Sequence, residues 1–227
     1  MELSTDGDPA TPSTSITTQI YNRVRADVLA SVLEPGQKLK IDELRKTYGS
    51  GASPIREALS LLTSDGLVER VDQRGFRVAL VSAEAFDELL LTRCWLEERA
   101  LAESIARGGK DWEERVVLAE YHLSKTERST SQKTFIANQE WEACHKAFHM
   151  ALISACGSAI LLNFCDQLYD QNIRYRHVAG KVAYPKRNIE KEHRAIMRAT
   201  LDRDVTKAVA SLLDHYRTTG SYLTKGL

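Results

Sequence analysis

Four histidines have the residue type and the spacing of a metal centre. His145 and His149 are four positions apart, so on a helix they lie on one face. His193 and His215 fall on the apolar stripes of two later segments with helical periodicity. Neutral imidazole is the commonest protein ligand for zinc, nickel and similar ions, and facing helices of a bundle are a usual place for such a site. The sequence therefore predicts that these four side chains bind a divalent transition metal, zinc or nickel, in a helical interior.

The alternative is that each histidine is an ordinary core residue with its own hydrogen bond. For any one of them taken alone, this alternative is the better interpretation. Four buried imidazoles would need four separate polar partners, whereas one ion satisfies all of them together. We therefore prefer the metal site.

A second group of residues has the pattern of a helix that contacts DNA. Ser53 can bond a phosphate at a helix start, where backbone N–H groups are free. Arg56 projects from the first turn and can bind guanine O6 and N7, or phosphate. Arg74 and Gly75 lie in a later turn, where a cation and a small residue suit close approach to the DNA backbone. The remaining predicted contacts are Pro54, beside Ser53, and the basic residues Lys38, Lys40, Arg45 and Lys46.

Short helices and a hairpin must position this second group. Ser53-Pro54 is a start signal, with Ser53 as the N-cap and Pro54 at the first helical position. The predicted elements are, in order, helices over 17–33, 41–48 and 53–65 and strands over 67–71 and 76–81. Helix, helix, turn, helix and β-hairpin is the order of a winged helix-turn-helix, whose last helix enters the DNA major groove.

Long amphipathic helices must position the histidines. The predicted spans are 83–107, 111–129, 133–156, 159–177, 184–201 and 205–223. Short loops between such helices indicate an antiparallel bundle with an apolar interior. The predicted fold is therefore mainly α, with a disordered tail over residues 1–15, a winged helix-turn-helix domain over 16–81 and an all-helical domain over 82–227.

Composition limits the other classes of protein. Of the 227 residues, 43% are hydrophobic and 27% charged, which excludes a disordered or collagen-like chain. No apolar run approaches the roughly 20 residues of a membrane helix. The formal net charge is +0, from 31 basic and 31 acidic residues, so overall charge gives no support for nucleic-acid binding.

The N-terminus and the cysteines bear on cellular location. Residues 1–15 are polar and lack the basic start and apolar stretch of a signal peptide. The four cysteines show no close paired spacing, so we expect reduced core residues. Together these features predict a cytoplasmic protein.

The N-terminal part resembles the GntR family of bacterial transcription regulators. The resemblance is carried by Pro35-Gly36-Gln37-Lys38-Leu39, Leu44, Ser53-Pro54-Ile55-Arg56-Glu57-Ala58-Leu59, Gly66-Leu67-Val68 and Gly75-Phe76-Arg77-Val78. It implies that Arg56 and its neighbours contact an operator. Many relatives carry Arg just before the Ser or Thr that opens the recognition helix, whereas this chain has Ala52. That departure puts one base or phosphate contact in doubt.

The C-terminal part resembles the FCD domain, the ligand-sensing helical domain of the FadR subfamily. Matching pieces are Arg93 with Leu96-Glu97, Phe148-His149 with Leu152, Gly157-Ser158, Glu192-His193 with Ile196, and His215. Many members bind a divalent metal through one Asp and three His, and the Asp lies four residues before the first His. His145 occupies that position here. An all-imidazole set would favour borderline metals, and the departure leaves open whether His145 or a water completes the set.

The resemblance also implies a small carboxylate effector at the open positions of the metal, with a cation at its other end. Arg93 is the first candidate, since it matches an inward Arg of the family; the alternative is an ion pair with Glu97. Arg174 and Arg176, which flank Tyr175, are weaker candidates with a solvated helix terminus as their alternative. Within the family, the combined features look most like a regulator induced by carbon starvation, which implies a C5 dicarboxylate such as glutarate.

Three functions remain to be compared. The leading one is a homodimeric regulator, expected to be a repressor, that binds double-stranded operator DNA and has no membrane partner. The second is a metal-dependent enzyme on a helical bundle, against which the pair His145 and His149 encloses Lys146 and Ala147 and lacks the Glu of His-Glu-x-x-His. The third is a regulator whose metal is purely structural.

Overall fold

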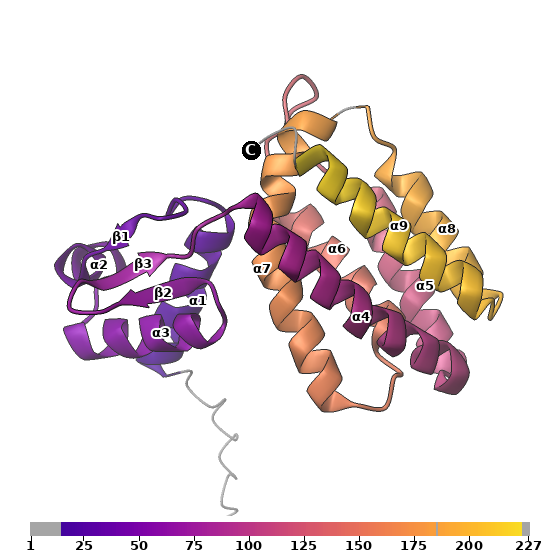
Figure 1. Cartoon of the computed structure of the whole chain (residues 1–227), viewed down its shortest axis with the longest axis horizontal. Coiled ribbons are helices and arrows are strands. Elements are labelled where there is room, and N and C mark those ends of the chain that lie inside the picture. The colour runs from indigo at the N-terminus through magenta and orange to yellow at the C-terminus, as the bar shows by residue number, and fades with distance from the viewer. Residues whose placement is uncertain (1–14, 185, 224–227) are drawn as a thin grey trace, which may run out of the picture.

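The computed structural model describes residues 15–184 and 186–223, which form a small N-terminal domain beside a helical bundle (Figure 1). The elements are α1 (Ile16–Leu29), β1 (Lys38–Leu39), α2 (Ile41–Tyr48), α3 (Ala52–Ser64), β2 (Val68–Val71), β3 (Gly75–Val78), α4 (Ala83–Arg107), α5 (Lys110–Lys125), α6 (Gln139–Ile153), α7 (Ala159–Ala183), α8 (Ile189–Leu201) and α9 (Val205–Leu223). Apart from Ser15, the predicted tail lies outside the described residues. Within those two ranges, no helix is both long enough and apolar enough to span a membrane.

The N-terminal domain has the predicted order of helices and hairpin. Its α3 packs against α1 and β2 through Ile55, Leu59 and Leu62, all fully buried at helical spacing. The sheet is antiparallel with the order β1-β3-β2, and Leu39 pairs with Phe76. The short strand β1 was not expected from the sequence. It fixes the chain between α1 and α2 against the hairpin.

Three predicted boundaries in this domain are wrong. Helix α3 begins at Ala52 with Gly51 as its N-cap, so Ser53 lies inside the first turn and its Oγ donates to Glu57 Oε1 at 3.1 Å. A proline is tolerated there because the first helical N–H groups have no partner within the helix. Helix α1 ends at Leu29, because Ser31 takes a left-handed conformation with φ of 58°. The second hairpin strand ends at residue 78 instead of 81.

The bundle contains the six predicted helices within the described part of the chain. Helices α4 and α9 run over their predicted residues and pack against each other. Ser82 caps α4 by accepting a hydrogen bond from the N–H of Ala85 at 3.2 Å. The core is filled by side chains with no exposed surface, such as Leu101, Phe148 and Ile196. This core holds the helices that carry the histidines.

The middle helices of the bundle differ from the prediction. Helix α6 begins at Gln139 instead of residue 133, because Ser129 and Asn138 organise the preceding segment as a loop and an N-cap. Helix α7 continues through Gly180, which had been expected to break it. A Cβ at Gly180 would lie 2.7 Å from the Phe135 ring, so the glycine allows the loop before α6 to pack on α7. Helix α5 spans 110–125 and α8 begins at Ile189.

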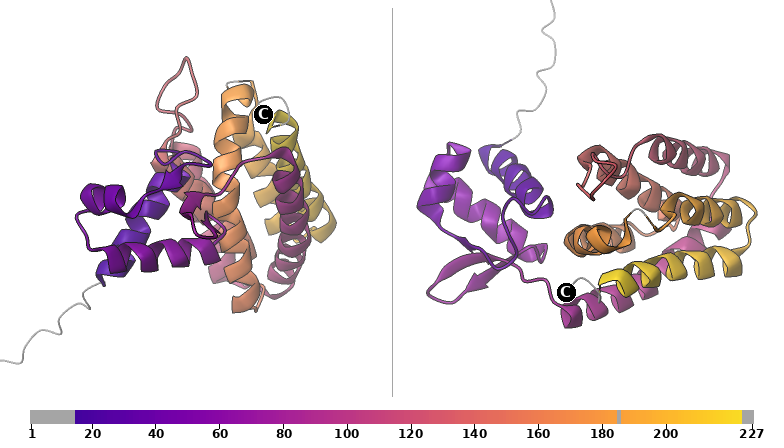
Figure 2. Two further views of the ribbon diagram at one scale, coloured as in Figure 1. Left: turned by 60° about the vertical axis from the view of Figure 1, so that its left-hand side comes forward. Right: turned by 90° about the horizontal axis from the view of Figure 1, so that it is seen from above.

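Helix α7 is the bundle helix that contacts the N-terminal domain (Figure 2). Gln171 Nε2 donates to the carbonyl of Asp65 at 2.8 Å, and Arg174 Nη1 donates to the carbonyl of Ala79 at 2.7 Å. Tyr169 and Ile173 on α7 belong to the same cluster of buried hydrophobic residues as the core of the N-terminal domain. One helix thus contributes to both parts of the molecule.

Candidate metal centre and DNA-binding surface

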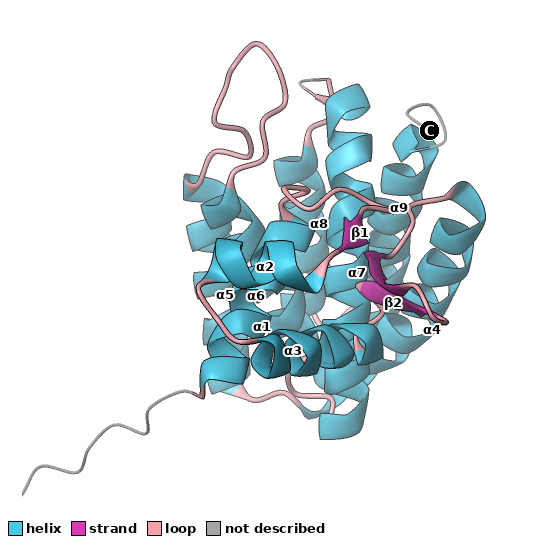
Figure 3. Cartoon of the chain, turned by 90° about the vertical axis from the view of Figure 1, so that its left-hand side faces the viewer, coloured by secondary structure: helices cyan, strands magenta, loops and turns pink. Residues whose placement is uncertain are grey.

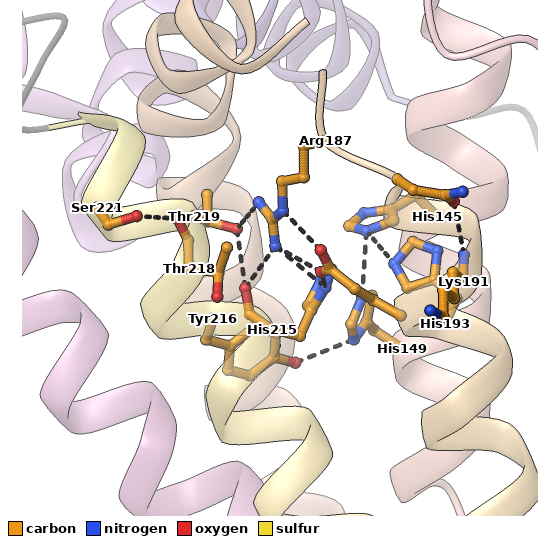
Figure 4. Close-up of polar contacts among 12 residues, drawn as sticks. His145, His149, Arg187, Lys191, His193, His215, Tyr216, Thr218, Thr219 and Ser221 are labelled. Carbon is orange, nitrogen blue, oxygen red and sulfur yellow. Dashed lines mark hydrogen bonds and ion pairs between the residues drawn. The ribbon is translucent and has the colours of Figure 1, made fainter. Parts of the chain in front are cut away.

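The four predicted histidines meet in the interior of the bundle (Figure 4). His145 and His149 come from α6, His193 from α8 and His215 from α9, and none exposes more than 4% of its surface. The Nε2 atom of His145 lies 3.1 Å from that of His193 and 3.2 Å from that of His149. The ligand atoms of all four lie within 4.8 Å of one another. Nitrogens around a tetrahedral zinc are about 3.3 Å apart, given Zn–N bonds of about 2.0–2.1 Å.

A carboxylate binds Nδ1 of His215, the ring nitrogen that is not offered to the cluster (the outer nitrogen). Its Nδ1 lies 2.7 Å from Glu192 Oε2. An ionised carboxylate only accepts hydrogen bonds, so Nδ1 carries the proton and Nε2 is left with a free lone pair. Arg187 fixes the same carboxylate, with Nη2 to Oε2 at 2.6 Å, and its Nη2 also donates to the backbone carbonyl of His215 at 2.8 Å. This arrangement is the usual outer-shell support of a metal-binding imidazole.

The outer nitrogen of His149 is held by a longer chain of hydrogen bonds. Its Nδ1 lies 3.0 Å from the hydroxyl of Tyr216, which itself donates to Glu97. Because the tyrosine proton goes to the carboxylate, the tyrosine oxygen accepts from His149 Nδ1–H. Arg93 Nε in turn donates to Glu97 at 2.8 Å. His149 therefore also presents an unprotonated Nε2 to the centre.

Electrostatics and donor type fit a metal ion at this point. Burial lowers the pKa of all four histidines, most strongly for those on α6 and α8, and nearby arginines lower it further. The imidazoles are therefore neutral, as metal ligands must be. Lone pairs 3.2 Å apart repel unless a cation or a proton lies between them. A set of imidazoles suits a borderline divalent ion better than magnesium or calcium.

A cavity of about 340 Å³ opens beside His193. Trp141 and Ile189 supply apolar surface, and Arg128 and Arg187 supply positive charge. Arg128 makes no ion pair with any described residue, and its Nε has no hydrogen-bond partner there. Burial and the two nearby arginines Arg187 and Arg176 lower the pKa of Arg128 to about 10. The cavity is of a size that suits a small ligand, and its lining carries both signs of charge, since Glu120, Glu127 and Glu190 lie there beside the two arginines.

The predicted effector arginines lie in different surroundings. Arg93 and Arg176 line a second space beside His145 and His215, of only about 10 Å³. Arg93 makes the ion pair with Glu97 that was the alternative for it, at 2.8 Å. Arg176 is also buried and pairs with Glu142. Arg174 lies away from both spaces, at the contact between the two domains.

Sequence reasoning missed Arg128 and Arg187. The sequence pattern placed them inside the predicted helices 111–129 and 184–201, whereas Arg128 lies in the loop between α5 and α6 and Arg187 just before α8. No periodic signal marks a loop residue. The adjacent Glu192-His193 pair was noticed, but the partner of Glu192 was not predictable from spacing.

The predicted DNA contacts lie on or beside α2, α3 and the β2–β3 hairpin of the N-terminal domain, and α2 and α3 lie toward the viewer in Figure 3. Arg56 is exposed on α3 and makes no ion pair with a described residue. Arg74 and Gly75 are exposed at the end of the hairpin, with φ of 89° at Gly75. Lys40 and Arg45 are exposed and pair with acidic residues of their own helix at 2.7 and 3.3 Å, contacts of little energy that a phosphate can replace. Ser53 is exposed, and Pro54 beside it is partly buried.

Comparisons with known proteins agree with this arrangement. Residues 16–78 match the model of bacterial regulatory proteins of the gntR family, and residues 88–218 match the FCD domain. The chain is 37% identical over 195 residues to the HTH-type transcriptional regulator BphR of Paraburkholderia xenovorans, covering 86% of this chain and 80% of the relative. It is 32% identical over 202 residues to the HTH-type transcriptional repressor GlaR of Escherichia coli, covering 87% and 91%.

Solved structures share the fold. E. coli McbR/YncC superposes with a TM-score of 0.76 at 20% identity, over 93% of this chain and 98% of that one. A GntR regulator from Rhodococcus sp. RHA1 superposes with a TM-score of 0.75 at 19% identity, over 94% and 100%. The relatives are regulators and not enzymes, which excludes the enzymatic alternative. The chain therefore belongs to the GntR family of bacterial transcription regulators and carries an FCD domain.

Proposed function

We propose that the chain is a cytoplasmic, dimeric repressor whose operator binding changes when a small dicarboxylate binds beside a histidine-held zinc or nickel ion. Residues 16–81 are the DNA-binding domain, and residues 82–227 bind metal and effector and form the dimer. The observation that carries the proposal is the cavity beside His193, because it places one imidazole of the neutral cluster beside Arg128, which is half-buried and makes no ion pair within the described part of the chain.

The two ends of the effector have separate partners in this proposal. The metal, when bound, offers coordination positions to one carboxylate. His145 and His149 hold it from one side, and His193 and His215 from the others, with His145 completing an all-imidazole set. The guanidinium of Arg128 neutralises the far carboxylate, since its Nε has no hydrogen-bond partner and it makes no ion pair within residues 15–184 and 186–223. A C5 acid such as glutarate is of a size that the cavity of about 340 Å³ accepts.

Two of the predicted effector arginines keep a role close to the metal. Arg93 pairs with the buried Glu97 and Arg176 with the half-buried Glu142, so each already has an anionic partner before any effector arrives. We infer that Arg93 orients His149 through Glu97 and Tyr216, as its hydrogen bonds support. Arg174 lines neither space and donates to the carbonyl of Ala79, so its position does not support a role in effector binding.

A thermal-shift screen tests the effector. Wild-type protein is stripped with chelator or loaded with zinc, and C3 to C6 dicarboxylates are added. At 100 times its dissociation constant, a ligand of the folded state adds about 2.7 kcal/mol. We expect one acid to raise the melting temperature of the zinc-loaded protein only, and Arg128→Ala to abolish that shift. Arg115→Ala, an exposed charge change on α5, is the matched control and keeps the shift.

Two other results of the screen would change the conclusion. A shift that survives verified metal removal would make the metal structural. No shift with any dicarboxylate would contradict this effector class.

Exposed apolar side chains support a dimer through α4 and α7. These helices pack together, and each exposes two large hydrophobic residues four positions apart: Leu91 and Trp95, 50% and 63% exposed, and Ile160 and Phe164, 73% and 54% exposed. Exposed apolar patches commonly mark association surfaces. A dimer would place two recognition helices against two half-sites of the operator.

Trp95→Glu is therefore expected to convert the dimer to a monomer, because it places a charge in an apolar contact. Light scattering after gel filtration measures the mass. Val117→Glu on α5, also an exposed apolar residue at 45%, is the matched control and should stay dimeric. A Trp95→Glu protein that remains a dimer would place the interface elsewhere.

A further inference from the structure

Helix α7 lies between the metal centre and the DNA-binding domain, and one residue touches both. The hydroxyl of Tyr169 is hydrogen-bonded to Nδ1 of His145. The Tyr169 ring, 1% exposed, belongs to the hydrophobic cluster that forms the core of the N-terminal domain. Ile173, one turn later, belongs to the same cluster. A shift of the His145 imidazole therefore acts directly on a side chain packed in the other domain.

The next residue, Asp170, connects the same two parts through charge. Its Oδ1 accepts from Lys146 Nζ at 2.8 Å, and Lys146 directly follows His145 on α6. Its Oδ2 accepts from Arg25, which lies on α1 of the DNA-binding domain. Asp170 is buried, at 7% exposed, so solvent screens these ion pairs less than surface ones. Lys146 also pairs with Asp166 at 2.7 Å, but Asp166 makes no hydrogen bond or ion pair with Arg25.

We propose that Tyr169 and Asp170 are positioning residues that transmit occupancy of the metal centre to the DNA-binding domain. The proposal rests on the proposed function, since it assumes that the histidine cluster holds a metal and that α3 binds DNA. His145 would be one of the residues that hold the metal, and its neighbours Tyr169 and Lys146 then fix the position of α7 against α6 through their contacts with His145 and Asp170. Asp170 then fixes α1 through Arg25, and α3 packs on α1. Occupancy thus alters the orientation in which α3 is presented.

The test uses the metal alone as probe and the full chain as protein. A DNA duplex is selected from a random library by the wild-type protein, and its dissociation constant is measured by fluorescence anisotropy with stripped and with zinc-loaded protein. Coupling between two sites is typically about 5- to 150-fold. We expect a ratio of at least about fivefold in wild type. Asp170→Asn should reduce the ratio to below about twofold, because it removes the charge that connects Lys146 to Arg25.

Asp166→Asn is the matched control, because it removes a carboxylate from the same lysine and the same helix without touching Arg25. It should keep the wild-type ratio. A full ratio in Asp170→Asn overturns the proposal, and so does a ratio of one in wild-type protein with verified metal content. If the wild-type protein binds no metal or no duplex, the proposed function itself is contradicted. The relay, meaning the coupling through Tyr169 and Asp170, is then contradicted as well.

A second measurement does not depend on DNA and covers the case in which Asp170→Asn folds poorly. Hydrogen exchange of the α1 peptides is followed in Tyr169→Phe and in Tyr216→Phe. Both variants remove a tyrosine hydroxyl from an imidazole, but only Tyr169 packs against the DNA-binding domain. Faster exchange of α1 in Tyr169→Phe alone supports the relay. Equal exchange in the two variants overturns it, because a purely structural role would affect both alike.

Discussion

Replacing His193 by alanine is expected to weaken metal binding by at least about 100-fold, since loss of an outer-shell partner alone costs 10- to 100-fold. His193 supplies the only ligand from α8 in the cluster and lies 3.1 Å from His145. Metal content after dialysis against a calibrated chelator measures the effect. His122→Ala is the matched control, because His122 is exposed on α5 and lies outside the cluster. Equal metal content in the two variants would remove the site from this cluster.

The same substitution should also remove the stabilisation that metal gives to the fold. Metal at 1,000 times its dissociation constant adds about 4 kcal/mol, or roughly 8 to 16 °C in melting temperature. Wild-type protein is expected to show this rise on loading with zinc or nickel, and His193→Ala to show little of it. Glu192→Gln should fall between them, since it removes the carboxylate that supports His215 and pairs with Arg187 but leaves all four imidazoles in place. A rise of equal size in His193→Ala would mean that the ion stabilises the protein from another place.

Arg56→Ala is expected to weaken binding to the selected duplex by about 10- to 100-fold, because one good bidentate base contact is worth about 1–3 kcal/mol. Arg56 is exposed on α3 and has no ion pair within the described chain, so its guanidinium is available to DNA. Fluorescence anisotropy at fixed salt measures the affinity. The dimer mass should stay unchanged, since Arg56 is not one of the exposed apolar residues of α4 and α7 to which the interface is assigned.

Two controls separate base contact from charge. Arg115→Ala changes the net charge equally but lies on α5 of the bundle, and it should leave the affinity unchanged. Arg56→Lys keeps the charge and loses the planar fork, so it should recover phosphate binding without full discrimination between duplexes. Unchanged affinity in Arg56→Ala would contradict the assignment of α3 as the recognition helix.

The parts of the fold that could be predicted are those with strong local signals. Helix α4 matched its prediction because a serine cap precedes it and glycines follow it. The end of α7 could not be predicted, because the glycine at 180 serves the close approach of Phe135, 45 positions earlier in the chain, and does not end the helix. The start of α3 was displaced because Ser53 bonds Glu57 instead of capping the helix. Sequence periodicity does not contain such tertiary contacts.

The same distinction applies to the site. The histidines could be predicted as a group, since each lies on an apolar stripe and stripes of a bundle face a common interior. Arg128 could not, because the sequence pattern placed it in a helix over 111–129, whereas α5 ends at Lys125 and leaves it in a loop. The orientation of the imidazoles also depends on Glu192 and Tyr216, whose contacts join residues 23 and 67 positions apart. Residue type thus predicted the ligands, and only the folded chain revealed what supports them.

Helix α7 has a consequence for the way such regulators diversify. It lies within the segment that matches the FCD domain, yet Tyr169 and Ile173 complete the hydrophobic core of the DNA-binding domain. The DNA-binding domain therefore cannot be transferred to another protein without α7 and keep its core intact. A chimera that joins residues 16–78 of this chain to the sensor of a relative inherits a foreign α7 and loses part of its own core. Such a chimera is expected to fold well only if the foreign α7 carries the residues of this chain at the positions that contact α1 and Gly66.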